Sequence, residues 1–483
     1  MVRAASSLLA SLALTAAPAT ASEHIVTLGD SLTFAYEAEF GFRVRMLGVG
    51  TVGDGFGPEV RNWVEILNDP AFRKDRFDLG NRNTFRLFTL WPFGFTTFLF
   101  RHDYNWAIPG LKIDELRRFV DGSSSFTELL AGNPDFGLLL TALELGGIGD
   151  SEFALADLES QIQNTATRLT LLIGGNDINS VYGTIYEGGS ADNFVSDFLD
   201  DAAVILDRVQ ELNPALEVVA VNVPHAGITP DVQSLHPTDP VKTGRVTAVL
   251  RDLNARLAAL AASRGVGYAD IFTPTLALLD PDPLCIDGIQ FFNTGSTTGD
   301  LDYVWLNGEL SANFHPNTNA HALIANAIID AFNATYQAGI PPLTTTEILG
   351  GLLEKPASEI DMSFASWAAA YGLPDRPESD DSDRDGVPAG IEFALGLNPT
   401  LPDGGKLRSA VVDHHGGRAL ELTYPLRLPD SARYTLLPAA GSVFEDLVPF
   451  AASPVPGPDG LARAVLPMTG RAGFLRLEAT IAP

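Results

Sequence analysis

The chain has 483 residues, of which 46% are hydrophobic, so it can bury a large core and is expected to form two or three domains. Its formal net charge of −29 argues strongly against nucleic-acid binding, which requires basic surfaces. A single cysteine, Cys285, excludes an internal disulfide, so stability must come from the core and from any bound metal.

The first 21 residues have the pattern of a secretory signal. Arg3 precedes an apolar stretch from Leu8 to Ala17, and Ala19 and Ala21 form a small-x-small cleavage site. The stretch is too short to span a membrane, and no later run reaches the ~18 apolar residues of a transmembrane helix. We therefore predict an exported protein without transmembrane segments, secreted or periplasmic, and attachment to the cell surface stays open.

A short apolar strand, residues 25–28, ends at Gly29-Asp30-Ser31 and is followed at once by a helix-like pattern. This serine stands at the carboxyl edge of a sheet, where open α/β folds place their ligand sites. The residues alone leave two interpretations, a nucleophile or a helix cap.

Residues 85–100 contain six Phe and one Trp. The first interpretation is a core hairpin or helix pair, and the second is an apolar lid or wall over the site. Before them, Gly48 to Gly53 matches G-x-G-x-x-G, but no helix opens at its third glycine, so we do not expect a nucleotide site.

Strand-like and helix-like stretches then alternate as far as residue 335. Apolar strands are expected at 169–173, 216–223 and 267–272, and helices at 194–212 and 244–263. Continuous apolar strands separated by such helices predict a parallel sheet covered on both faces.

Four loops of this sheet offer the groups that acyl transfer needs. A hydroxyl nucleophile requires a base to take its proton, and the oxyanion requires aimed donors. Ser31 supplies the hydroxyl, and His315, in Phe314-His315-Pro316-Asn317, supplies the base. Gly110 offers a backbone N–H, and Asn176, after Gly174-Gly175, offers a side-chain amide.

These four pieces, in this order, resemble the GDSL or SGNH hydrolase family of esterases and lipases over residues 24–335. The resemblance implies a flavodoxin-like three-layer α/β/α sandwich that needs no cofactor for catalysis. It implies Ser31 as nucleophile and His315 as general base. The N–H groups of Ser31 and Gly110 and the amide of Asn176 would form the oxyanion hole.

One position departs from the family pattern. The family usually has an aspartate three residues before the histidine to orient the imidazole, and Ala312 stands there in this chain. We expect a carboxylate of the same loop, Glu309 or Asp302, to take this role, or a backbone carbonyl to orient the ring. The alternative is a decayed site without activity.

A second motif follows near residue 380. Asp381, Asp383, Asp385 and Glu392, with Gly386 at the bend, fit the D-x-D-x-D-G-x5-E loop. Ca²⁺ takes several oxygen ligands, so this pattern predicts a structural calcium ion at the junction of two domains. The stretch resembles the EF-hand-like or dockerin-like loops of exported bacterial proteins, and a solvated acidic linker is the alternative.

The chain therefore divides into a signal peptide (1–21), a hydrolase domain (22–340), a linker with the calcium loop (341–400) and a small all-β domain (401–483). We predict a serine esterase or lipase that hydrolyses carboxylic esters of small molecules or lipids by a Ser-His acyl-enzyme route. The alternatives are a carbohydrate O-deacetylase of the same family and a catalytically inactive surface-binding protein. The residues do not indicate an oligomeric state.

Overall fold

A parallel sheet forms the centre of the computed structural model. The structure describes residues 23–36, 43–45, 60–90, 95–125, 154–190, 192–307, 313–428, 431–441, 448–449, 457, 460–468 and 474–482. The sheet has the order β1-β5-β6-β7, and all its neighbours are parallel. Its strands are β1 (His24–Gly29), β5 (Ala166–Leu172), β6 (Glu217–Val221) and β7 (Gly267–Ala269). The predicted signal, residues 1–21, and the glycines at 48–53 lie outside the described residues.

Residues 104–108 extend this sheet on the other side of β1. The N–H of Trp106 donates to the carbonyl of Thr27 (2.8 Å), and the N–H of Ile108 donates to that of Gly29 (3.1 Å). Counting this segment as the second strand in the chain gives the order 2-1-3-4-5, which is the flavodoxin-like order. In this topology ligands bind where the strand order reverses, which here is between the carboxyl ends of β1 and β5.

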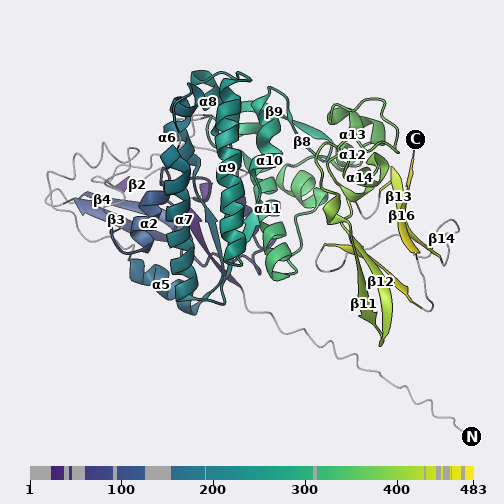
Figure 1. Ribbon diagram of the computed structural model, residues 1–483, viewed down its shortest axis with the longest axis horizontal. Coiled ribbons are helices and arrows are strands. Elements are labelled where there is room, and N and C mark those ends of the chain that lie inside the picture. The colour runs from purple at the N-terminus through teal and green to yellow at the C-terminus, as the bar shows by residue number, and fades with distance from the viewer. Residues whose placement is uncertain are drawn as a thin grey trace, which may run out of the picture.

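Helices cover both faces of the sheet (Figure 1). On one face α2, α5, α6, α7 and α9 pack against one another, and on the other face α11 packs against β6, β7 and α1. The helices of this part are α1 (Trp63–Leu67), α2 (Ile113–Val120), α5 (Leu155–Asn164), α6 (Gly175–Tyr186), α7 (Asp192–Leu212), α8 (Pro230–Leu235), α9 (Lys242–Ser263), α10 (Phe272–Thr275) and α11 (Thr318–Tyr336). Of the helices in the described ranges, none is long and apolar enough to cross a bilayer. The predicted α/β fold with a parallel sheet is confirmed.

The expected strand at 267–272 is shorter than its sequence pattern suggests. It ends at Ala269, and the side chain of Asp270 accepts hydrogen bonds from the N–H groups of Phe272 and Thr273 (3.0 Å each), which turns the chain into α10. The aspartate therefore marks the end of β7, although the apolar pattern continues to Phe272.

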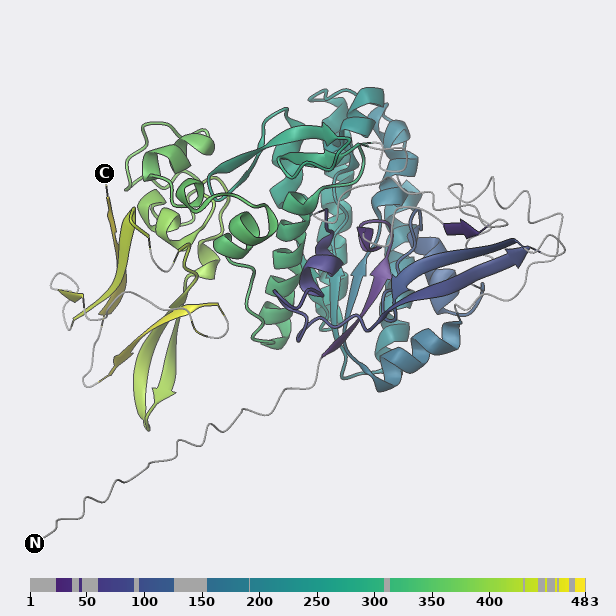
Figure 2. The same cartoon turned by 180° about the vertical axis from the view of Figure 1, so that it is seen from behind.

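The phenylalanine-rich stretch contains an antiparallel hairpin. Its strands are β3 (Arg82–Leu90) and β4 (Phe95–His102), and β2 (Arg43–Arg45) pairs with β4. The backbone is thus the hairpin of the first interpretation, while the side chains of 84–100 are outside what the structure describes. In both views the hairpin projects from the β1 side of the sheet, away from the C-terminal end of the molecule (Figure 2).

A small sheet that the sequence did not predict lies before the histidine loop. Its strands are β8 (Leu284–Ile286), β9 (Ile289–Ser296) and β10 (Tyr303–Leu306), in the order β10-β9-β8. These strands lead the chain back to the carboxyl edge of the central sheet, so they determine where His315 lies.

The C-terminal part of the chain has its own core after residue 363, while residues 346–360 pack into the core of the parallel-sheet fold. It contains the π-helical turn η4 (Thr346–Leu352), the helices α12 (Ala357–Ile360), α13 (Phe364–Ala370) and α14 (Ala389–Leu395), and the strands β11 (Arg408–His414), β12 (Gly417–Tyr424), β13 (Tyr434–Gly441), β14 (Val448–Pro449), β15 (Ala462–Pro467) and β16 (Phe474–Ile481). The strands form two antiparallel sheets, β11-β12-β15 and β14-β13-β16. Trp367, Phe393 and Tyr424 are buried between them and the helices. We call α13, α14, the strands β11 to β16 and their connecting loops the C-terminal module.

Candidate active site

Ser31 lies on a tight turn directly after β1. The N–H groups of Thr33 and Phe34 both donate to the carbonyl of Asp30 (3.1 Å each), which closes the turn. Gly29 is required here, because a Cβ atom at this position would lie 2.3 Å from the carbonyl oxygen of Leu172 in β5. The turn therefore presents Ser31 at the carboxyl end of β1, beside the end of β5.

The side chain of Asp30 stabilises this turn by a hydrogen bond within it. Its Oδ1 accepts from the N–H of Leu32 (3.0 Å), and the carboxylate is fully buried. Burial raises the pKa of Asp30 to about 7, although the amides of Leu32, Gly175 and Gly174 favour its charged form. Asp30 thus links the Ser31 turn to the N terminus of α6, which is a structural task.

The Gly110 loop is attached to the Ser31 turn by Asn105. The side-chain amide of Asn105 donates to the carbonyl of Thr33 (2.9 Å), and its Oδ1 accepts from the hydroxyl of Thr27 (3.0 Å). Gly110 itself has φ +78°, a conformation that favours glycine. The loop that carries Gly110 therefore runs along the same edge of the sheet as Ser31.

Asn176 lies in the first turn of α6, across the edge of the sheet from Ser31. One N–H of its amide donates to the carbonyl of Leu111 (3.1 Å). The next residue, Asp177, accepts from the N–H of Ile113 (3.2 and 3.3 Å). The N terminus of α6 and the Gly110 loop are thus joined at two consecutive positions. An amide has two N–H donors, so Asn176 keeps one for another acceptor.

His315 is placed by β10 and by the cap of α11. The N–H of Leu306 donates to the carbonyl of His315 (2.9 Å), and Trp305 forms a bridge with Pro316. Asn317 then caps α11, with its Oδ1 accepting from the N–H of Thr318 (2.7 Å). The histidine is buried, with 7% of its surface exposed.

Tyr36 joins the loops of Ser31 and His315. Its hydroxyl donates to the carbonyl of Pro316 (3.1 Å) and lies 2.9 Å from Nε2 of His321. Because the hydroxyl has only one proton to give, Nε2 of His321 is the donor in the second bond. Burial and the nearby His315 lower the pKa of His321 to about 3, so His321 stays neutral.

No sequence pattern indicated Tyr36, and we expected only packing or capping from His321. Tyr36 and Pro316 are 280 positions apart, and no local spacing connects them. The position of Tyr36 five residues after Ser31 was the only feature of the sequence that could have suggested a role at the site.

Of the two carboxylates expected to orient His315, the structure describes Asp302 but not Glu309. Asp302 forms an ion pair with Lys355, with 2.5 Å between Oδ1 and Nζ. This contact weighs against Asp302 as the partner of the imidazole. Glu309, like Ala312, lies outside the described residues, and its role stays a prediction.

Two other histidines near this edge have no catalytic geometry. His225 is fully buried, its Nδ1 accepts from the N–H of Gly227 (3.1 Å), and its Nε2 lies 3.1 Å from the hydroxyl of Thr247. Burial lowers the pKa of His225 to about 4. His236 packs against Tyr182. Both are therefore packing residues.

A small apolar cavity adjoins the site. Its volume is about 110 Å³, and Leu32, Phe314 and Pro316, the sequence neighbours of Ser31 and His315, contribute to its wall. The remaining wall comes from α11, α10 and residues 224–229. Its lining is almost entirely apolar, so it suits a hydrocarbon group better than a polar one.

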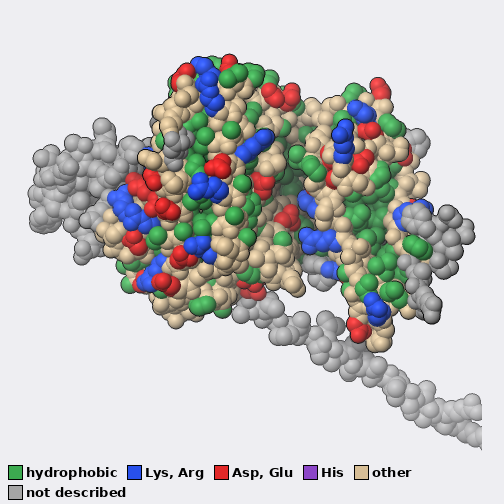
Figure 3. Space-filling view, viewed as in Figure 1, with side chains coloured by type: hydrophobic (Ala, Val, Ile, Leu, Met, Phe, Trp, Pro, Cys, Tyr) green, Lys and Arg blue, Asp and Glu red, His purple; other side chains and the backbone are tan. Residues whose placement is uncertain are grey.

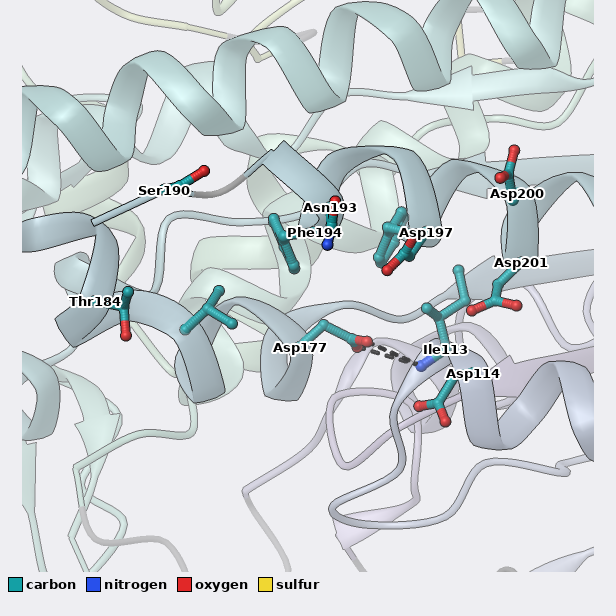
Figure 4. Close-up of a pocket in the computed structure, with 12 residues that line it drawn as sticks. Ile113, Asp114, Asp177, Thr184, Ser190, Asn193, Phe194, Asp197, Asp200 and Asp201 are labelled. Atoms are coloured by element: carbon teal, nitrogen blue, oxygen red, sulfur yellow. Dashed lines mark hydrogen bonds between the residues drawn. The ribbon is translucent and has the colours of Figure 1, made fainter. Parts of the chain in front are cut away.

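A larger cavity of about 890 Å³ lies between α2, α6 and α7, and Asp177 forms part of its wall. Figure 4 shows the carboxylates of Asp114, Asp197 and Asp200 around it and the two bonds from Asp177 to Ile113. Its wall is strongly acidic, which disfavours anionic ligands.

The predicted metal ligands lie far from this edge, in the C-terminal module. Asp381, Asp383 and Asp385 each have a carboxylate oxygen within 4.8 Å of the others, and a second such group joins Asp385 to Glu392 and Asp403. The sequence pattern included four of these residues and missed Asp403.

The fold and the loops at its edge are those of a known class of hydrolases. Residues 25–328 match the sequence model of the GDSL-like lipase/acylhydrolase family, and the chain belongs to this family. The predicted resemblance is thereby confirmed. No protein of curated function matches the chain.

Several solved structures are similar to this chain at low identity. An extracellular lipase from Streptomyces rimosus is 13% identical, with 64% of this chain and 100% of that chain covered and a TM-score of 0.32. A phospholipase A1 from Streptomyces albidoflavus is 14% identical, with 65% and 100% covered and a TM-score of 0.32. A carbohydrate esterase of family 3 from Talaromyces cellulolyticus is 12% identical, with 65% and 99% covered and a TM-score of 0.29. The chain spans 60% of a gut microbial diltiazem-metabolizing enzyme, at 10% identity over 87% of its own length and a TM-score of 0.32.

Proposed function

We propose that this chain is an exported serine hydrolase that cleaves carboxylic esters, with Ser31 as nucleophile and His315 as general base. One observation carries the proposal. The turn of Ser31 ends β1 where the strand order reverses, next to the end of β5 from which α6 and Asn176 follow, and Tyr36 bonds to the loop of His315. Membership of the GDSL-like lipase/acylhydrolase family supports it.

The reaction would proceed through an acyl-enzyme. Ser31 Oγ attacks the ester carbonyl carbon while its proton passes to the imidazole of His315. The tetrahedral intermediate collapses, the carbon–oxygen bond to the alcohol breaks, and the alcohol leaves with the proton from His315. A water molecule then gives a proton to His315 and attacks the acyl carbon. The carboxylic acid is released as Ser31 Oγ regains its proton.

The oxyanion would be held by the N–H groups of Ser31 and Gly110 and by the amide of Asn176. The bond from Asn176 to Leu111 supports this role, because it fixes the amide and leaves one N–H available. A preorganised donor of this kind contributes about 10²–10³ in kcat.

The substrate would be an ester with a short apolar acyl group. The cavity beside Leu32, Phe314 and Pro316 is apolar but small, at about 110 Å³. The same small volume favours a second candidate, a carbohydrate O-deacetylase, because an acetyl group needs little space. The hairpin of β3 and β4 would act as an apolar wall for longer chains.

The test is hydrolysis of p-nitrophenyl esters from acetate to palmitate by residues 22–483, with Ser31→Ala as the matched variant. We expect kcat to fall by about 10⁴-fold or more in Ser31→Ala, because the nucleophile is lost while binding remains. The rate should be highest for short acyl chains. An acetylated oligosaccharide tested alongside distinguishes the second candidate.

Equal rates for the wild type and Ser31→Ala would contradict the serine mechanism. A folded wild type without activity on any of these esters would favour the inactive, binding alternative, in which Ala312 marks a decayed site.

A further inference from the structure

The acidic loop before α14 and the segment after it form one cluster of carboxylates. Asp381, Asp383 and Asp385 lie on the loop, and Glu392 lies in α14. Asp403 reaches the cluster from the segment that leads to β11, so that its carboxylate lies within 4.8 Å of Asp385 and Glu392. The two groups share Asp385, so carboxylates from three successive segments lie around this residue.

Glu392 is the observation that indicates a ligand in this cluster. Its side chain is 0% exposed, and neither carboxylate oxygen has a hydrogen-bond partner among the described residues. Oδ2 of Asp383 and Oδ1 of Asp403 also lack one there. Burying an unpaired carboxylate is costly unless a cation meets it.

The chemistry of these groups fits Ca²⁺. All the donors are oxygens, and the loop positions match those that bind Ca²⁺ through carboxylates and one backbone carbonyl. The ninth position of such loops, which often binds through a water molecule, is Ala389 here and has no side-chain oxygen. With bidentate Glu392, the carbonyl of the seventh position and Asp403, the site offers about seven oxygens, within the range that Ca²⁺ takes.

We propose that the five carboxylates bind one Ca²⁺ and that Asp403, which the loop pattern does not include, is one of its ligands. The ion would thereby hold the segment before β11 against α14. Without it, the negative charges of Asp385, Glu392 and Asp403 repel one another.

The position of α14 gives this ion a structural task. Phe393, next to Glu392, packs under the guanidinium of Arg427, which lies 4.6 Å from the ring centroid. Arg427 is buried and pairs with Asp287, in the loop between β8 and β9, at 2.8 Å. The calcium ion therefore supports the contact through which the C-terminal module attaches to the hydrolase fold.

Calorimetric titration of the chelator-treated chain, residues 22–483, with calcium chloride tests the site. We expect one ion per wild-type chain, no binding by Glu392→Gln, and at least about tenfold weaker binding by Asp403→Asn. Asp375→Asn, an exposed aspartate of the same module, is the control and should bind like the wild type. A wild type that does not bind calcium, or Asp403→Asn with unchanged affinity, would overturn the proposal.

Thermal unfolding of the same proteins distinguishes two roles of Glu392, that of a calcium ligand and that of a side chain needed only for stability. In chelator, Glu392→Gln should melt at or above the wild-type temperature, because the neutral amide removes a buried charge. In calcium the wild type should gain several degrees while Glu392→Gln does not. A lower melting temperature of Glu392→Gln in both conditions would refute the role of Glu392 as a ligand. These readouts do not depend on Ser31, so they are independent of the proposed esterase activity.

Discussion

At the scale of single residues, the site depends on side chains that would not touch the substrate. Asp30 closes the turn of Ser31, Asn105 ties the Gly110 loop to it, and Tyr36 ties it to the loop of His315. The bonds of Asn105 and Tyr36 each cross from one loop to another at the carboxyl edge of the sheet. Neighbouring side chains therefore determine the mutual position of Ser31 and His315, the proposed nucleophile and base, and a shift of about 1 Å can cost about 10²-fold in rate.

Replacing Tyr36 by Phe tests this positioning role. The change removes the hydroxyl that bonds to Pro316 and His321, so we expect kcat to fall by about tenfold to hundredfold with little change in KM. Steady-state kinetics on a p-nitrophenyl ester gives both constants.

Tyr186→Phe is the matched control, because the hydroxyl of Tyr186 also donates to a carbonyl, that of Pro237 at 2.5 Å, away from Ser31. Both variants should lose about 1 kcal/mol of unfolding free energy, but only Tyr36→Phe should lose kcat. If both lose kcat equally, the effect of Tyr36 is one of stability alone.

At the scale of elements, the connection from β5 to α6 decides where Asn176 lies, the side chain proposed for the oxyanion hole. Gly174 has φ +124°, and a Cβ atom there would lie 2.6 Å from Cγ2 of Val223. The chain can therefore leave β5 and begin α6 at once only with glycine at this position. Because α6 begins at Gly175, Asn176 lies in its first turn, directly after the carboxyl end of β5.

Gly174→Ala should destabilise the protein by about 2–4 kcal/mol, since backbone strain and overpacking act together. Chemical unfolding in urea measures the change. Gly244→Ala in α9 is the control: a Cβ atom there meets nothing within 4 Å, and alanine should stabilise the helix by about 0.5–1 kcal/mol. A similar loss of unfolding free energy in both variants would contradict the proposed effect of the positive φ and close contact at Gly174.

At the scale of the whole molecule, a hydrolase fold and a C-terminal module with its own core meet through buried polar contacts. Arg427 binds Asp287 and also donates to the carbonyl of Ile360 (3.0 Å). On the face seen in Figure 3, acidic and basic side chains are interspersed. The net charge of −29 is therefore not gathered into one acidic patch on this face.

Export can be tested directly on the full chain. Expressed from residue 1 in a bacterial host, the protein should be recovered outside the cytoplasm with Ser22 at its N terminus, as read by mass spectrometry. Leu12→Arg should block export, because a charge interrupts the apolar stretch. Recovery of an intact N terminus from the cytoplasm of the wild-type culture would contradict the proposed signal.

Much of the fold could be predicted from local pattern. The buried strands β1, β5 and β6 are continuous apolar runs because both faces of a parallel sheet are covered, and α7 and α9 follow helical spacing. The sheet of β8, β9 and β10 was missed, because β8 and β10 have only three and four residues, too few to show a period.

The sequence by itself determined the family, the α/β class, the loops that carry Ser31, Gly110, Asn176 and His315, and the acidic loop. These features depend on neighbours within a few positions, which propensity and spacing record. Only the tertiary structure decided that Tyr36 joins two of those loops and that Asp403 completes the acidic cluster. Such contacts form because the sheet edge and α14 bring together segments that are far apart in the sequence. No local pattern of residues records which distant segments will meet.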